Sequence, residues 1–496
     1  MADGVQPLGQ IALHRRLGLR GPEPAVHSYV WSGARRTVER EGARHEYYPR
    51  QYARPDSLLE HVRFALRYEA LDLGLMHDAL GALGAGALAA WVCAEPSGEF
   101  SRRAWFLYEE LRGETIDLEG GARGNYVEAL RPALHYVGPA RNSPRHRVRN
   151  NLLGDRRCCP TLRRTARLEA MIARDLAARA QALAANCEPE VLARAVNWLY
   201  TKETRSSFAI EGEQVSAQRQ ARFVAALQQV TRFDATDQAA LVDLQGRIVD
   251  PRYAAAGWRQ TQNFVAETTR GFGQHVHYIS PRPEDVPALM EGWMALTRRL
   301  LASDLDAVLA AAAVSFMFVF IHPFDDGNGR LHRFLLHHVL TRRGFVAPGL
   351  IFPLSATILR GRHHYDRALE GFSAAIMPAI DWHWAGQRLV VTNATRDLYR
   401  FADLTGLAEY LYDQVEETIE VDLAEELSFL QAFDAAYSAV TGIVDLPDQR
   451  AQLLVRLLLQ NGGRLARSRR ARFAELTDDE LAAMEDAVQA VLAARE

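Results

Sequence analysis

The chain is 496 residues long, has a formal net charge of −3 and is 48% hydrophobic, which suits two to four domains with hydrophobic cores and gives no sign of an overall polyanion-binding protein. Lys202 is its only lysine and has no glycine near it, which excludes a P-loop and a protein-kinase site because both need a lysine in a defined motif. The four cysteines lack the Cys-x-x-Cys spacing of a zinc ribbon and indicate no disulfide framework.

Residues 1–160 are predicted to form an accessory domain of helices. Residues 1–55 lack a regular pattern, whereas apolar residues recur at a helical spacing over 57–68, and a second helix is predicted at 101–111. Residues 119–160 are rich in Gly, Pro, Asn and Arg. This composition favours a solvated linker, with a basic binding strip as the alternative. The role of this domain does not follow from its sequence.

Residues 161–400 are predicted to form a helical core domain, and residues 401–496 a C-terminal helical domain. The helices expected in the core domain are 170–185, 189–210, segments of 214–250, 283–299, 304–321, 364–376 and 379–400. Between them, residues 262–280 alternate polar and apolar side chains, which predicts a β-hairpin.

The longest apolar run, 307–321, is too short for a membrane span. It has about fifteen residues, whereas a spanning helix needs ~20. No signal peptide opens the chain. We therefore expect a cytoplasmic protein that makes no contact with a membrane.

The stretch 322–333, His-Pro-Phe-Asp-Asp-Gly-Asn-Gly-Arg-Leu-His-Arg, carries most of the candidate chemistry. Its Gly-Asn-Gly turn leaves backbone N–H groups free at the start of the following helix, where anions bind well. Arg330 and Arg333 are three residues apart, so both point toward that anion site from the first helical turn. Asp326 could hold a divalent cation against phosphate oxygens, and a neutral His322 could take a proton from an attacking hydroxyl. Together these groups predict a phosphate-transfer site, although each alone would be an ordinary turn residue.

This stretch resembles the signature of the Fic family, HxFx(D/E)GNGRxxR, at every specified position. The resemblance implies a protein adenylyltransferase, which moves AMP from ATP to a hydroxyl side chain of a target protein and uses Mg²⁺. It makes His322 the general base and Asp326 the magnesium ligand, with Asn328 and Arg330 completing the catalytic set. The residues that it implies in nucleotide binding are Gly327, Asn328, Gly329, Arg330 and Arg333.

A second motif lies upstream, at the end of a predicted helix. Residues 206–212, Ser-Ser-Phe-Ala-Ile-Glu-Gly, resemble the inhibitory motif of the Fic family, (S/T)xxxE(G/N), with Ser207, Glu211 and Gly212 at the matching positions. A carboxylate beside Arg333 would form a bidentate pair with it and would repel the outer phosphates of ATP. The motif therefore predicts autoinhibition, whereas Glu211 by itself would be an ordinary acid at a helix end.

Two further segments resemble parts of Fic proteins. The predicted hairpin 262–280 would be the flap over the active site, and an exposed strand edge there can hold a target segment with its hydroxyl against His322. Residues 358–365, Ile-Leu-Arg-Gly-Arg-His-His-Tyr, resemble the segment that closes the nucleotide pocket. They add Tyr365 to the predicted nucleotide-binding residues.

The C-terminal domain begins with a long amphipathic helical region at 403–440. An apolar helix follows Leu446, Asn461-Gly-Gly ends it, and Thr477 is placed to cap a last helix. Five arginines lie within residues 464–472, and the pattern suggests a winged-helix-like or helix-turn-helix unit that could contact DNA. Since arginine replaces lysine almost everywhere in this chain, a solvated basic turn is the alternative.

These patterns predict a mostly α protein with a Fic-type helical core and a small β-hairpin flap, flanked by an N-terminal helical domain and a C-terminal winged-helix-like unit. The predicted function is that of an autoinhibited adenylyltransferase acting on a Ser, Thr or Tyr hydroxyl. Reversal of the modification through a water positioned by Glu211, transfer of another phosphate-containing group, and a DNA-binding regulator are the alternatives. The target protein, a homo-oligomeric state and the event that relieves inhibition are left open.

Overall fold

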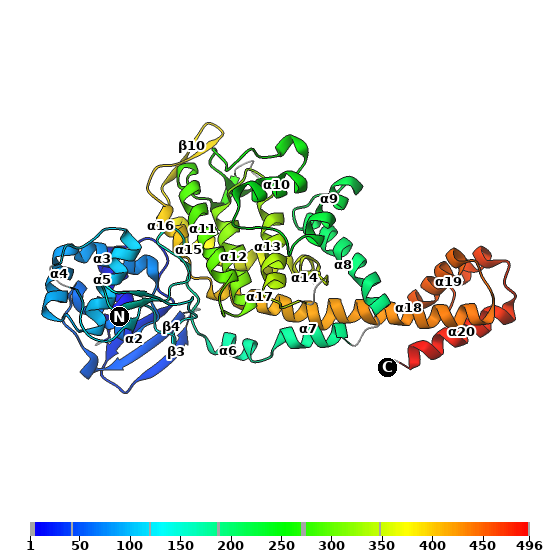
Figure 1. The fold of residues 1–496 in the computed structure, drawn as a ribbon, viewed down its shortest axis with the longest axis horizontal. Helices are drawn as coiled ribbons and strands as arrows, with labels where there is room; N and C mark the ends of the chain where they lie inside the picture. The colour runs from blue at the N-terminus through cyan, green and yellow to red at the C-terminus, as the bar shows by residue number, and fades with distance from the viewer. Residues whose placement is uncertain are drawn as a thin grey trace.

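The structure is a computed structural model that describes residues 5–40, 43–118, 121–185, 189–268, 274–346 and 349–494. Helices dominate it and the sheets are small. An N-terminal unit, a larger helical centre and a C-terminal helical unit lie in a row, and one long helix joins the last two (Figure 1). The predicted fold class, mostly α with small β elements, is confirmed.

The N-terminal unit combines a small sheet with helices. Its strands are β1 (Gln6–Leu8), β2 (Val26–Trp31), β3 (Arg36–Arg40) and β4 (Ala43–Pro49), followed by the short β5 (Val127–Glu128), β6 (Arg141–Ser143) and β7 (Val148–Asn150). The first four form one sheet in the order β1-β2-β4-β3, in which only β2 and β4 are parallel. The helices are α1 (Gly9–Leu17), η1 (Arg50–Tyr52), α2 (Leu58–Tyr68), α3 (Leu73–Leu83), α4 (Ala85–Ala94) and α5 (Glu99–Arg112).

The prediction that residues 1–55 lack regular structure is therefore wrong, and the sheet in this helical domain was not predicted. Strand β3 is exposed at nearly every position and β2 is buried at all but its ends. Neither shows the alternation of polar and apolar side chains by which a strand is recognised in a sequence. The two helices predicted in this region are confirmed as α2 and α5, and the side chain of Ser57 caps α2 by accepting a hydrogen bond from the Glu60 N–H.

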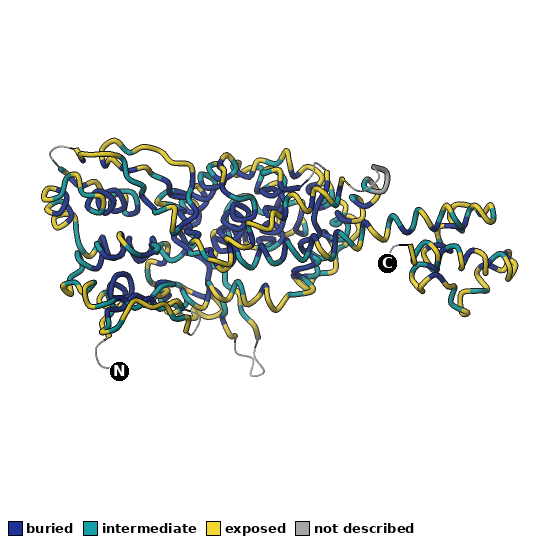
Figure 2. The backbone as a smooth tube through the Cα atoms, turned by 90° about the horizontal axis from the view of Figure 1, so that it is seen from below, coloured by how far each residue is buried: buried dark blue, intermediate teal, exposed yellow. Residues whose placement is uncertain are grey.

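The helices of the central unit include most of those predicted for the core domain. They are α6 (Ala166–Ile172), α7 (Leu176–Ala185), α8 (Pro189–Ile210), α9 (Ala217–Gln228), α10 (Gln238–Ile248), η2 (Pro251–Tyr253), η3 (Pro283–Asp285), α11 (Val286–Leu301), α12 (Ala307–Ile321), α13 (Asn328–Arg342), α14 (Leu354–Arg360), α15 (Arg362–Ile376), η4 (Met377–Ala379), α16 (Arg396–Arg400) and α17 (Thr405–Glu417). Helix α12 is buried at every residue after its first, and α13 packs along it in the buried centre of the molecule (Figure 2). A helix that is apolar all round belongs in such a place.

Two hairpins extend from the helical centre. The predicted flap is confirmed as β8 (Phe264–Thr268) paired antiparallel with β9 (Gln274–Ile279), while the part of the prediction at 269–273 lies outside the described residues. The helix predicted at 379–400 is wrong for most of its length. There β10 (Trp382–Ala385) and β11 (Arg388–Val391) form a hairpin around Gly386, whose φ of +65° suits a tight turn.

The C-terminal unit is a group of helices at the end of a long rod. Helix α17 continues through the π-helical segment η5 (Thr418–Leu423) into α18 (Ala424–Ile443), which confirms the long predicted helix (Figure 1). After it come α19 (Asp448–Gln460), η6 (Arg467–Phe473) and α20 (Asp478–Ala493), the last with a capping box between Thr477 and Glu480. The described residues 401–494 contain no strand, so the wing of the predicted winged-helix-like unit is absent there. Contact of this unit with DNA stays a prediction.

Buried apolar side chains form a separate core in each unit. Trp105 belongs to the N-terminal core, Trp293 to the central core and Leu454 to the C-terminal core. The central core also includes Tyr136 and Leu427, from beyond the predicted limits of the core domain. The domain limits at 160 and 400 therefore stay a prediction. Among the described residues no single helix is long and apolar enough to cross a membrane, and the bent pair α3–α4 meets that test by length and composition only.

His338 on α13 should make the stability of the core depend on pH. Its Nδ1 lies 2.8 Å from the carbonyl oxygen of Val230, and burial lowers its pKa to about 4. The unfolded chain takes up a proton near pH 6.5, whereas the folded protein does so only near pH 4. This group therefore lowers the free energy of unfolding as the pH falls from 6.5 to 4.

We expect the variant His338→Asn, which keeps a hydrogen-bond donor near Val230, to lose less stability than the wild type between pH 7 and pH 4.5, by about 1–2 kcal/mol. Urea unfolding at both pH values measures the difference, with the exposed His275→Asn as the control. An equal loss in the wild type and in His338→Asn would contradict the assignment.

Candidate active site

A helix–loop–helix unit made by α12 and α13 presents the candidate site. Helix α12 ends at His322, whose backbone is left-handed with a φ of +52°, an uncommon conformation for a side chain of this size. Helix α13 begins at Asn328, after Gly327 with a φ of +90°. The loop between them is therefore a sharp turn from one buried helix into another, which fixes its backbone in space.

The His322 imidazole is neutral in this environment. Burial lowers its pKa to about 4, although its contact with Val319 raises it. Its Nδ1 lies 3.1 Å from the Val319 carbonyl oxygen, so we assign the proton to Nδ1 as a donor to that oxygen. Nε2 is then left with a lone pair and can accept a proton.

Arg259 holds the backbone on which His322 stands. Its Nε donates to the His322 carbonyl oxygen at 2.7 Å, and its two terminal nitrogens donate to the carbonyl oxygens of Thr261 and Pro281 at 2.7 and 2.6 Å. The Arg259 N–H donates to the Pro323 carbonyl oxygen at 2.8 Å. One buried guanidinium thus joins the base of the flap to the loop. In a chain with 58 basic residues, no pattern in the sequence singles it out.

The Asn328 side chain braces the loop from within. Its Oδ1 accepts the Phe324 N–H at 3.0 Å, and its Nδ2 donates to the Phe324 carbonyl oxygen at 2.7 Å. The Gly327 N–H donates to Asp326 Oδ1 at 2.6 Å. The Asn328 amide and the Gly327 N–H, which were expected to bind phosphate, are therefore engaged within the loop, and their roles toward a nucleotide stay predictions.

The two arginines of the stretch are buried and paired with acids. Arg330 lies 2.9 Å from Asp326 Oδ1 and 3.1 Å from Glu213 Oε1, and Arg333 lies 2.8 Å from Glu211 Oε1. Glu213 was not predicted. Its place directly after the motif 207–212 is the only signal that the sequence offers.

The end of α8 brings the second motif to the same place. Ser207 accepts from Arg333 twice, at its hydroxyl (2.9 Å) and at its carbonyl oxygen (2.7 Å). A Cβ on Gly329 would come within 2.3 Å of Glu211 Oε1. The Glu211 carboxylate therefore lies directly against the first turn of α13. It follows the end of α8 at Ile210, where Gly212 takes a left-handed φ of +72°.

Charge stabilises this position of Glu211. Burial alone would raise its pKa, but the charge of Arg333 and a hydrogen bond from it outweigh burial, with Arg330 contributing, so the pKa is lowered overall. The carboxylate is thus ionised at neutral pH, at the positive end of a helix dipole and beside two guanidinium groups. It occupies a site built for an anion.

A magnesium ion fits the site only with help from a ligand. Among the described residues no group of three or more His, Cys, Asp or Glu side chains could hold a metal. The side chain of Asp326 is 42% exposed. Among the described residues, its hydrogen bonds, from the Gly327 N–H and from Arg330, are both accepted by Oδ1. Magnesium is commonly bound through one or two carboxylates plus substrate phosphates, so a single carboxylate is compatible with it.

The β8–β9 hairpin is tied to the loop at several points. Asn263 Nδ2 lies 3.4 Å from the Phe324 carbonyl oxygen, and the Thr261 hydroxyl donates to Asp325 Oδ1 at 2.6 Å. The Tyr278 hydroxyl donates to a backbone carbonyl near the end of α12. These contacts place the predicted flap beside His322, as expected.

Tyr365 lies deeper than expected for a residue that contacts a base or ribose. It is 5% exposed on α15, and its ring faces those of His332 and Tyr410 at centroid distances of 6.2 and 6.1 Å. Burial raises its pKa to about 12, while the nearby charge of Arg333 lowers it. In this structure Tyr365 supports Arg333 from the interior, and its contact with a nucleotide stays a prediction.

Comparison with known proteins supports the resemblance seen in the sequence. Residues 235–340 match the model of the Fic/DOC family. A protein named Protein adenylyltransferase Fic from Nematostella vectensis is 36% identical over 94 residues, which are 18% of this chain and 19% of that protein. One of the same name from Culex quinquefasciatus is 35% identical over 111 residues, 21% of this chain and 19% of that protein. The chain thus spans about a fifth of the length of these relatives.

Solved structures of Fic proteins are also similar to this chain. A Fic family protein from Desulfovibrio desulfuricans G20 has a TM-score of 0.39 and 19% identity, covering 56% of this chain and 80% of that one. A Fic domain containing signaling protein from Bacteroides thetaiotaomicron has a TM-score of 0.38 and 18% identity, covering 54% and 97%. The family assignment itself rests on the sequence match, which contains the whole stretch 322–333 together with α10, α11, α12 and most of α13. Residues 235–340 of this chain therefore contain a Fic/DOC family domain.

Proposed function

We propose that this protein is an autoinhibited protein adenylyltransferase, which moves AMP from ATP to a Ser, Thr or Tyr hydroxyl of a target protein. The observation that carries the proposal is the loop between α12 and α13, where a neutral imidazole stands beside a helix N-terminus flanked by two buried guanidinium groups. The names of the Nematostella and Culex relatives support the same activity.

In this reaction the target hydroxyl attacks the α-phosphorus of ATP in line with the departing pyrophosphate. His322 accepts the hydroxyl proton at Nε2, since Nδ1 is engaged with Val319. The flap, joined to the loop through Arg259, Thr261 and Asn263, would hold the target segment along its strand edge. The carbonyl contact from Arg259 keeps the imidazole from swinging away with its backbone.

The remaining residues of the loop act on the phosphates. Arg330 and Arg333 emerge from a buried helix, so their guanidinium groups are held where charge builds up on the phosphates. Asp326 would hold Mg²⁺, which when bound neutralises charge on the phosphate oxygens. The Gly-Asn-Gly turn lets the phosphates approach the backbone at the start of α13.

Glu211 inhibits the reaction by taking the place of a phosphate. Its carboxylate lies against Gly329 and pairs with Arg333 at 2.8 Å. An outer phosphate of ATP would need the same guanidinium, and it would meet a second negative charge there. ATP could bind beside Glu211 only with its phosphates displaced, which misplaces the α-phosphorus relative to His322.

The same carboxylate could also position a water molecule and remove AMP from a modified target. Glu211 lies close enough to His322 to affect its pKa, so a water between the two groups would have two bases near it. Removal of AMP would then need Glu211, whereas transfer of AMP would be inhibited by it. The two activities therefore respond in opposite directions to the loss of this carboxylate.

We expect Glu211→Gly to increase AMP transfer about tenfold or more, which corresponds to only ~1.4 kcal/mol of relieved inhibition. Label from the adenosine part of ATP is measured on protein after incubation with a lysate. Glu213→Gln serves as the matched control because its carboxylate pairs with Arg330 and not with Arg333. Equal labelling by the wild type and Glu211→Gly would remove the inhibitory role.

In the Glu211→Gly background, we expect His322→Ala to reduce AMP transfer by ~10²-fold or more, because the proton acceptor is lost. Binding of ATP should be retained, since the arginines and the Gly-Asn-Gly turn are unchanged, and calorimetry with ATP and Mg²⁺ checks it. Full labelling by the double variant would show that His322 is not the base.

Ser207→Ala should relieve inhibition in part. It removes the hydroxyl that accepts from Arg333 Nε at 2.9 Å but leaves Glu211 and the Ser207 carbonyl in place. One such hydrogen bond contributes about 0.5–1.5 kcal/mol, so labelling should rise about two- to tenfold. The neighbouring Ser206→Ala is the matched control, and an increase equal to that of Ser207→Ala would point to a general loosening of α8.

A further inference from the structure

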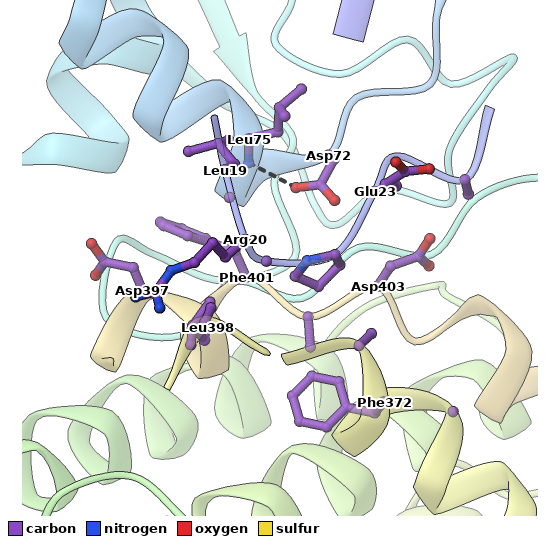
Figure 3. Close-up of a pocket in the computed structure, with 18 of the residues that line it drawn as sticks. Leu19, Arg20, Glu23, Asp72, Leu75, Phe372, Asp397, Leu398, Phe401 and Asp403 are labelled. Atoms are coloured by element: carbon purple, nitrogen blue, oxygen red, sulfur yellow. Dashed lines mark hydrogen bonds between the residues drawn. The ribbon is translucent and has the colours of Figure 1, made fainter. Parts of the chain in front are cut away.

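A cavity of about 720 Å³ lies between the N-terminal unit and the central unit (Figure 3). Its walls come from residues 18–25 and 72–78 on one side, and from α15 and residues 394–407 on the other. Neither the stretch 322–333 nor the Glu211 motif lines it. Cavities of this size where two units meet are typical of small-molecule sites.

Much of the cavity wall is apolar. The larger apolar side chains that line it are Leu19, Leu75, Phe372, Leu398, Phe401 and Leu407, and all but Leu407 are labelled in Figure 3. Glycines and alanines supply much of the remaining surface, so few long side chains fill the space. An apolar body of a ligand could be buried here.

Among the cationic groups in the wall, two are already neutralised. Arg20 forms a bidentate pair with Asp381 at 2.8 and 3.1 Å. Arg163 Nε lies 2.6 Å from Asp403 Oδ2. The third, Arg367, is exposed to solvent and contacts a neighbouring histidine ring. The cavity therefore presents little positive charge to a ligand.

Carboxylates outnumber guanidinium groups in the wall, by five to three. The five are Glu23, Asp72, Asp78, Asp397 and Asp403. Figure 3 shows Asp72, Glu23 and Asp403 together on one side of the view. Among the described residues, the other four carboxylates each form an ion pair with an arginine or a histidine. No such pair is found there for Asp72.

Asp72 is held in place without a counter-charge. Its Oδ1 caps α3 by accepting from the Leu75 N–H at 2.9 Å, and its own N–H donates to Gln10 Oε1 at 2.7 Å. Burial, with a smaller contribution from the negative charge of Asp403, raises the pKa of Asp72 to about 6. A positive group placed beside this carboxylate would be attracted by both acids.

We propose that this cavity binds a small amine with an apolar body, whose ammonium group pairs with Asp72 and whose body lies against Phe372 and Leu398. The two requirements come from separate observations. The apolar wall requires a ligand with an apolar body. The unpaired carboxylate, in a wall without free buried cations, requires a ligand with a positive charge. The site does not depend on the adenylyltransferase proposal, because it shares no residue with the Fic loop.

Three probes of similar size and different charge test the proposal with the full chain. They are 2-phenylethylamine, the neutral 2-phenylethanol and the anionic phenylacetate. Calorimetry and the shift in Tm at pH 7.5 report binding. We expect the amine to bind at least tenfold more tightly than the alcohol, and phenylacetate to give no binding.

Two variants locate the binding site. Asp72→Asn removes the charge but keeps the α3 cap, since Asn and Asp cap helices about equally well. It should weaken binding of the amine about tenfold or more. Gly371→Leu adds a side chain on α15 where a Cβ meets nothing within 4 Å, so it should fill part of the cavity and abolish binding without straining the backbone.

Asp237→Asn is the matched control, because Asp237 is also the N-cap of a helix, α10, but lies outside the cavity. It should bind the amine like the wild type. The proposal fails if the amine does not bind, if the three probes bind equally, or if Asp72→Asn and Gly371→Leu both bind the amine as the wild type does.

Discussion

The ion pair between Glu211 and Arg333 is the contact on which the state of this site depends. Arg333 is 1% exposed, so its charge must be matched by a partner within the protein or by a bound anion. Glu211 supplies that partner at 2.8 Å and lies against the N-terminus of α13 at Gly329. Removing the acid would leave a buried cation facing an open anion site. On the proposed function, the phosphates of ATP would pair with this cation in place of Glu211. Glu211 and ATP therefore compete for the same interaction with Arg333.

The helix that carries Glu211 is fixed at several points along its length. The Glu203 carboxylate accepts the Ser355 N–H at 2.8 Å and faces His337 at 2.8 Å in the interior. The only lysine of the chain, Lys202, pairs with Asp422 in the π-helical segment at 2.7 Å. A shift of α8 as a whole would break these buried polar contacts together, at a cost of several kcal/mol. Movement of the last turn alone, from Ser207 on, breaks far fewer, so it is the less costly way to uncover Arg333.

The sequence allowed the chemistry of the site to be predicted better than its mechanical support. The twelve-residue stretch is contiguous and placed between two apolar helices, so the relation of His322 to Arg333 follows from local geometry alone. Glu211 and Arg333 are 122 positions apart in the sequence, and their contact could be predicted only from the family motif. Arg259, which holds the His322 backbone, makes its contacts through backbone carbonyls. Carbonyl partners leave no trace in side-chain patterns, and for that reason this residue was missed.

The elements that were predicted well are helices with a clear apolar periodicity. The elements that were missed are strands whose burial does not alternate clearly along the chain. Helices α8, α11, α12 and α15 carry apolar stripes or are buried throughout, and their predicted extents were close. The β10–β11 hairpin was taken for a helix. Both of its strands are four residues long and largely exposed, so they carry little of the burial pattern by which a strand is recognised. In the N-terminal sheet, β2 is buried at all but its ends and β3 is exposed at nearly every position, so neither strand shows an alternating pattern.

Helix α15 lies next to two features, the cavity between the units and the end of α12 that leads into the candidate active site. Phe372 lines the cavity and stacks on Phe320 with ring centroids 4.0 Å apart, two residues before His322 in sequence. Two turns earlier on the same helix, Tyr365 lies beside Arg333. A ligand in the cavity changes the site only if it binds two arrangements of α15 with different affinity. Because the packing of Phe372 on Phe320 leaves little room for a continuous shift, such coupling would have to act through discrete positions of this helix.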